Sequence, residues 1–76
     1  MRKNDFEILI TSDVDREKLA CEIYYKNKII AEISQETEKL LLEIFPSESQ
    51  NWWEIPLVEF QMILETAKNH LLERHS

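Results

Sequence analysis

The side chains that most often carry out chemistry are few in this chain and poorly placed for catalysis. His70 and His75 stand five residues apart near the carboxyl end, and the single cysteine, Cys21, lies far from both in sequence. This spacing matches no usual zinc pattern, and neither the cysteine nor any serine has a recognisable acid–base partner. We therefore expect no enzyme: no catalytic residue, no metal site and no cofactor.

The charge balance indicates a basic partner. Fifteen acidic residues against nine basic ones give a formal net charge of −6, whereas gripping phosphates requires clustered lysine and arginine. The chain also has no glycine, on which phosphate-binding loops depend. We expect no direct contact with nucleic acid, and no membrane contact because no apolar run is long enough. A lone cysteine, which can form no internal disulfide, is typical of a reducing compartment, so we expect a cytoplasmic protein.

One long helix is predicted over residues 56–73, because apolar residues recur there at the three-and-four spacing of a single helical face. The residues of this stripe are Leu57, Phe60, Leu64, Ala67 and Leu71, widened by Ile63 and Leu72. Polar residues occupy most of the other side, so the helix is amphipathic and must pack on an apolar surface.

Four strands are predicted upstream of the helix, over residues 5–11, 18–26, 29–34 and 40–45, because apolar and polar residues alternate there. Seventy-six residues make a single domain, with a sheet over residues 5–45, a linker over 46–55 and the helix. This order predicts an α+β fold: a four-stranded antiparallel β-meander with one long C-terminal α-helix packed on one face.

The register of the second and third strands follows from keeping apolar residues on one face. Pairing Tyr25 with Ile29 matches Ile23 to Ala31 and leaves a three-residue loop centred on Asn27, which tolerates a left-handed backbone. In this register Ile29 belongs to the inner face. The inner residues of the fourth strand are expected to be Leu40, Leu42 and Ile44.

The outer face of the predicted sheet is the main candidate site. Each strand contributes one glutamate to it: Glu7, Glu22, Glu32 and Glu43. The apolar residues expected among them are Leu9, Tyr24, Ile30, Leu41 and Phe45. One helix covers only one side of a sheet, and an exposed apolar patch rimmed by charge often marks an interaction site. The alternative is a solvated face whose glutamates maintain solubility and discourage edge pairing.

Trp52 and Trp53 stand together in the linker, where adjacent residues of an extended segment point in opposite directions. We expect one of them to join the core and the other to be an exposed anchor for a partner. In the alternative interpretation the second tryptophan covers the start of the helix.

Several segments resemble small bacterial immunity proteins of toxin systems, including contact-dependent growth inhibition. They are residues 22–25 (EIYY), 30–36 (IAEISQE), 42–46 (LEIFP), 53–60 (WEIPLVEF) and 64–68 (LETAK). The resemblance implies a cytoplasmic protein without catalysis of its own, which binds the C-terminal domain of its cognate toxin and masks the active site.

The residues and the resemblance lead to one functional hypothesis, an inhibitor of a basic toxin domain, with a nuclease as the expected class. Its contact candidates are Glu7, Glu22, Tyr24, Glu32, Glu43, Trp52 and Trp53. The alternatives are a module that homodimerises or joins an assembly through its open sheet face or edge strands, and a phage-type inhibitor of a nucleic-acid-binding complex.

Overall fold

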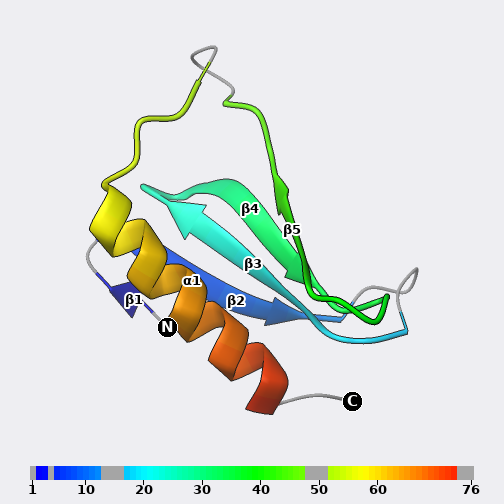
Figure 1. The fold of residues 1–76 in the computed structure, drawn as a ribbon. Helices are drawn as coiled ribbons and strands as arrows, with labels where there is room; N and C mark the ends of the chain where they lie inside the picture. Colours follow the sequence, from blue (N-terminus) through cyan, green and yellow to red (C-terminus); the bar gives the residue numbers. More distant parts are fainter. Residues whose placement is uncertain (1, 4, 13–16, 48–51, 74–76) are drawn as a thin grey trace.

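The computed structural model describes residues 2–3, 5–12, 17–47 and 52–73, which form one antiparallel sheet and one helix (Figure 1). The strands lie in sequence order: β1 (Arg2–Lys3), β2 (Phe6–Thr11), β3 (Ala20–Tyr25), β4 (Lys28–Ser34) and β5 (Leu41–Ile44), followed by α1 (Leu57–Glu73). The predicted α+β fold is confirmed, with β2 to β5 as the predicted strands. The additional strand β1 has only two residues, too few to show an alternating pattern.

The turn between β3 and β4 is shorter than predicted. Tyr25 pairs with Lys28 instead of Ile29, so Lys26 and Asn27 alone form the turn. Both turn residues have positive φ, 51° and 69°, the combination that matches the twist of the flanking strands in a two-residue hairpin. The left-handed backbone at Asn27 is therefore confirmed, and the three-residue loop is wrong.

A β-bulge allows the two-residue turn to coexist with the predicted pairing further along the hairpin. Ile23 pairs with Ala31 as predicted, but the next residue, Tyr24, pairs with Ile29, so Ile30 is an extra residue in β4. Ile30 lies in the core and is only 1% exposed, while Ile29 lies across from Tyr24. The prediction of Ile30 on the outer face and Ile29 on the inner face is wrong, because strict alternation cannot accommodate an extra residue.

The core lies between α1 and strands β2 to β4; α1 packs directly against β2 and β3 (Figure 1). Its buried residues are Phe6, Ile8, Cys21, Ile23, Ile30, Ala31, Ile33, Ile63, Ala67 and Leu71. Full burial of each large apolar side chain contributes about 1.5–3 kcal/mol. Cys21 is buried, and this burial raises the pKa of its thiol to about 11.

The helix is rotated relative to the predicted stripe. The line through Ile63, Ala67 and Leu71 is fully buried, whereas Leu57 is 69% exposed and Leu72 is also exposed. At about 100° per residue, Leu57 lies roughly 80° around the helix from that line. Placing Leu57 and Leu72 on the core face was wrong, because the sequence pattern marks the apolar half of a helix and not the centre of its contact.

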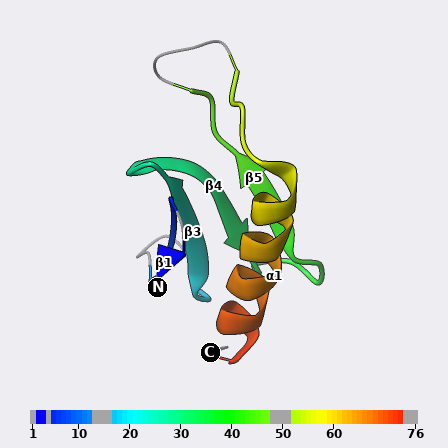
Figure 2. The same cartoon turned by 90° about the vertical axis from the view of Figure 1, so that its left-hand side faces the viewer.

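The inner side of β5 is not covered by the helix. Leu42 pairs with the core residue Ile33 and Ile44 with Ala31, so both face the side of the sheet that carries α1, as predicted. Both are nevertheless exposed, Ile44 by 60%, and Leu40 is exposed as well. The sheet is curled: in Figure 2, β3 lies to the left of α1, whereas β5 lies on the right, in line with α1.

Candidate partner-binding face

Three of the predicted glutamates form a line across the sheet. Glu22 on β3 pairs directly with Glu32 on β4, which pairs directly with Glu43 on β5. Side chains directly opposite one another on neighbouring antiparallel strands have Cβ atoms about 4.5–5.5 Å apart. We call these three residues the carboxylate row. The row therefore concentrates three negative charges along one line of the outer face.

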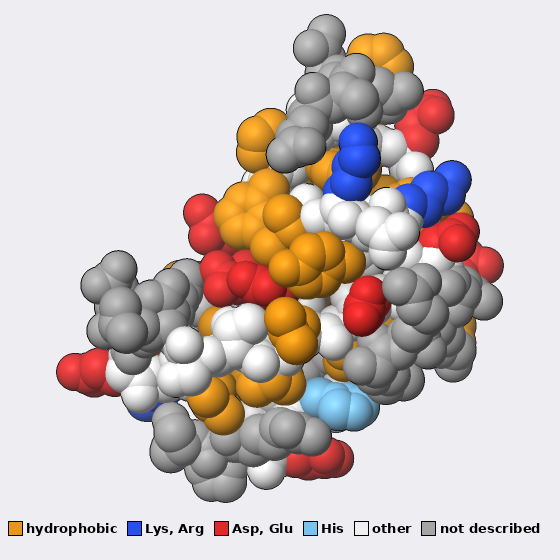
Figure 3. Space-filling view, turned by 180° about the vertical axis from the view of Figure 1, so that it is seen from behind, with side chains coloured by type: hydrophobic (Ala, Val, Ile, Leu, Met, Phe, Trp, Pro, Cys, Tyr) orange, Lys and Arg blue, Asp and Glu red, His pale blue; other side chains and the backbone are white. Residues whose placement is uncertain are grey.

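The neighbouring strand β2 extends the same face. Leu9 pairs with Glu22, so it lies next to the end of the carboxylate row. Glu7 pairs with Tyr24, two residues further along the strands. All four predicted glutamates therefore lie on one face, with Glu43 exposed and the other three half-buried. Figure 3, which views the molecule from the side opposite α1, shows acidic and hydrophobic side chains mixed on this face.

Tyr24 fixes one carboxylate of the row. Its hydroxyl donates a hydrogen bond of 2.8 Å to Oε1 of Glu22. That bond, followed by burial and the negative charges of Glu22 and Glu7, raises the pKa of Tyr24 above its ordinary value. The tyrosine therefore stays neutral at physiological pH, and the Glu22 carboxylate is held in a defined position beside an aromatic ring.

The two tryptophans divide as predicted. Trp53 is partly buried against the core, and its Nε1 donates a hydrogen bond of 2.8 Å to the carbonyl oxygen of Phe45. Trp52 is 58% exposed. It belongs to the segment between β5 and α1 and to no strand of the sheet, whereas the glutamates of the row are strand residues. Sequence reasoning had grouped it with the glutamates only by residue type.

The residues with catalytic or metal-binding chemistry do not converge. His70 lies on the flank of α1, with Nδ1 3.0 Å from the carbonyl oxygen of Thr66 one turn earlier, and His75 falls outside the described residues. Among the residues that the structure describes, no three of the His, Cys, Asp and Glu side chains are grouped so that they could hold a metal ion.

Sequence reasoning missed a second surface, the exposed apolar wall of β5. Leu40, Leu41 and Leu42 follow one another directly, so both faces of the strand are apolar at this point. Such a run departs from strict alternation, and it was the available signal that β5 is not an ordinary half-buried strand.

Within the described part of the chain, no helix combines the length and the apolarity needed to cross a membrane. No family model, curated protein or solved structure matches the chain.

Proposed function

We propose that this protein is an immunity-type inhibitor, which binds the basic C-terminal domain of a cognate toxin in the cytoplasm and occludes its active site. The observation that supports this most directly is the carboxylate row on the outer face. The class of toxin that fits best is a nuclease, because an enzyme that binds a polyanion presents a basic cleft.

The charge of the row favours a cationic partner. Glu22, Glu32 and Glu43 place three carboxylates next to one another on one face. A partner that places lysine or arginine over them makes charge-assisted contacts with several carboxylates at once. The row crosses three strands, a span of about 10 Å, which is enough for more than one cationic side chain.

The apolar residues beside the row supply contact area that charge alone does not. Leu9 is exposed at one end of the row, and Tyr24 holds Glu22 through its hydroxyl. Charge complementarity of this kind accelerates encounter and selects the partner, while buried aromatic and aliphatic groups slow its release. The outer face therefore offers both properties that an inhibitor needs.

The same row argues against self-association through the outer face, since a second copy presents the same negative charges to it. It would equally serve an inhibitor of a nucleic-acid-binding complex, as such a complex also displays a basic surface. Co-expression separates the two targets. An immunity protein restores growth of cells that express the toxin domain encoded beside its own gene.

The direct test measures association of that toxin domain with a charge-reversed row. We expect Glu22→Lys together with Glu32→Lys to slow association at least about tenfold at low salt and to reduce its salt dependence. The matched control reverses two exposed glutamates elsewhere, Glu38→Lys with Glu73→Lys. Either pair changes the formal charge from −6 to −2. Equal slowing by both pairs would reject the outer face as the contact surface.

A further inference from the structure

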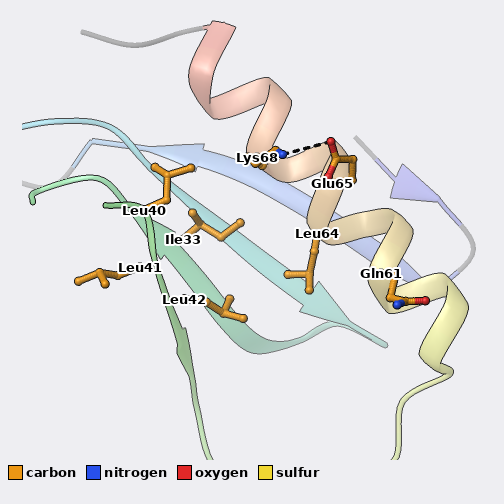
Figure 4. A pocket seen from close by; sticks show the side chains of 8 residues that line it. All are labelled: Ile33, Leu40, Leu41, Leu42, Gln61, Leu64, Glu65 and Lys68. Atoms are coloured by element: carbon orange, nitrogen blue, oxygen red, sulfur yellow. Dashed lines mark ion pairs between the residues drawn. The ribbon is translucent and has the colours of Figure 1, made fainter. Parts of the chain in front are cut away.

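A groove runs between α1 and β5 on the side of the sheet away from the carboxylate row (Figure 4). Ile33, Leu40 and Leu42 line it from the sheet and Leu64 from the helix. At its rim on α1, Lys68 Nζ lies 3.2 Å from Oε2 of Glu65. The groove is therefore apolar inside with a charged rim, and the toxin-binding proposal does not use it.

The wall of this groove is also the edge of the sheet. β5 is the last strand in the described sheet, and all four of its residues are exposed. The N–H of Phe45 donates to the carbonyl oxygen of Ile30 on β4, at 2.9 Å. Because backbone groups alternate in direction along a strand, the N–H and C=O of Leu42 and Ile44 point to the open edge. An apolar edge of this kind is a template for another strand.

We propose that the occupant is a second copy of this chain, with the two β5 strands paired antiparallel about a two-fold axis at Leu42. In this register Leu42 faces its own copy, and Leu40 faces Ile44 on the helix side. On the outer side Leu41 faces Glu43. Every pair therefore contains at least one apolar residue, and no two like charges stand opposite each other.

The neighbouring registers are less favourable. A two-fold axis at Glu43 sets that carboxylate directly against its copy, in a pair without ladder hydrogen bonds, where side chains are closest. An axis at Leu41 requires Lys39 and Glu38 to continue the strand, but residues 36–39 form a bend. A two-fold axis perpendicular to the sheet must pass through a residue pair, so no intermediate register exists.

The pairing about the two-fold axis explains why a second copy suits the groove. In the proposed dimer the second copy's β5 extends the sheet across the open edge, and the two-fold axis places the second helix on the same side of the sheet as α1. Pairing of the two β5 strands would cover Leu40, Leu42 and Ile44, which are 36%, 44% and 60% exposed. This apolar contact is smaller than the standard interface of about 800 Å² per partner, so we expect a weak dimer whose population depends on concentration.

Electrostatics distinguishes this contact from the proposed toxin contact. Each copy carries a formal charge of −6, so salt should strengthen self-association by screening the repulsion. Binding of a basic partner responds in the opposite direction. The outer faces of both copies remain open in the dimer, so reversing Glu22 and Glu32 should leave self-association intact.

The first test is sedimentation of the full chain from micromolar to millimolar concentration. We expect a monomer–dimer equilibrium that shifts toward dimer at higher salt, and at least a tenfold weaker association for Leu42→Lys. Leu9→Lys is the matched control, because Leu9 is a strand leucine of similar exposure on the far face, 52% against 44%. A monomer throughout this range, or equal weakening by both variants, would overturn the proposal.

The second test fixes the register through disulfide formation. In the proposed register, residue 42 of each copy lies about 5.5 Å from its counterpart between Cα atoms, within disulfide range, whereas residues 41 and 43 lie more than 7 Å from theirs. We expect Leu42→Cys to cross-link under mild oxidation, and Leu41→Cys and Glu43→Cys not to do so. The native Cys21 is buried and stays out of the reaction. Preferential cross-linking at position 41 or 43 would reject the Leu42 axis.

Discussion

The two halves of the sheet carry similar apolar patterns but lie in different environments. In β2 and β3 the residues that face the helix, such as Ile8 and Ile23, are buried. In β5 the corresponding residues Leu42 and Ile44 face the same side and remain exposed. The difference shows that alternation determines which side of the sheet a residue faces, while the position of the helix determines whether that side is buried.

The width of a helix accounts for this division. An α-helix with its side chains is about 10–12 Å across, and neighbouring strands are about 4.7–4.9 Å apart, so one helix cannot cover a sheet of five strands. The helix α1 packs on β2 and β3, and the buried residues of β4 complete the same core. The uncovered side of β5 therefore follows from the element count, and it forms the surface for the proposed second copy.

The difference in burial between the two halves can be tested by replacing one isoleucine in each half with alanine. Ile23→Ala should lower the free energy of unfolding by about 2–5 kcal/mol, because Ile23 is completely buried and its removal leaves a cavity. Ile44→Ala should lower it by about 1 kcal/mol or less, since water already reaches that side chain. Urea unfolding at a fixed low protein concentration measures both values.

The low concentration is essential, because any self-association through β5 adds to the stability of the wild type. Similar losses for the two variants would mean that Ile44 is covered in solution. A difference that shrinks as protein concentration rises would point to the second copy as that cover.

A smaller effect is expected in the linker that ties the end of β5 to the helix. Trp53→Phe keeps the aromatic packing but removes the Nε1 donor to Phe45, so we expect a loss of about 1 kcal/mol. Trp52→Phe should change the unfolding free energy by no more than about 0.5 kcal/mol, because Trp52 is mostly exposed. Acrylamide should quench the fluorescence of Trp52 more strongly than that of Trp53, measured in the two single-tryptophan variants. Equal quenching would contradict the assignment.

The smallest expected effect is an increase in the free energy of unfolding. It tests the carboxylate row between β4 and β5. Glu43→Gln removes the exposed charge at the end of the row, so we expect stability to rise by about 0.2–1 kcal/mol at low salt and the gain to fade as salt screens the row. Glu38→Gln, at an exposed position in the bend, is the control. A loss of stability for Glu43→Gln would show that this carboxylate is held by favourable contacts that outweigh the repulsion.

Much of the candidate site could be predicted because it depends on period and chain order. The glutamates occupy equivalent positions in four alternating strands, so a meander places them on one face whatever the details of the turns. The errors had local causes. Ile30 left the outer face because of a single bulge, and Trp52 was grouped with the glutamates although it belongs to no strand of the sheet.

The α+β architecture, the order of the main strands and the side to which most strand residues point could be predicted from the sequence, because these follow from periodicity and short connections. The strands that the helix covers, the place of the bulge and the open position of β5 beside α1 became visible in the folded structure alone. Those features depend on the curl of the sheet and the rotation of the helix, which arise from contacts among residues distant in sequence.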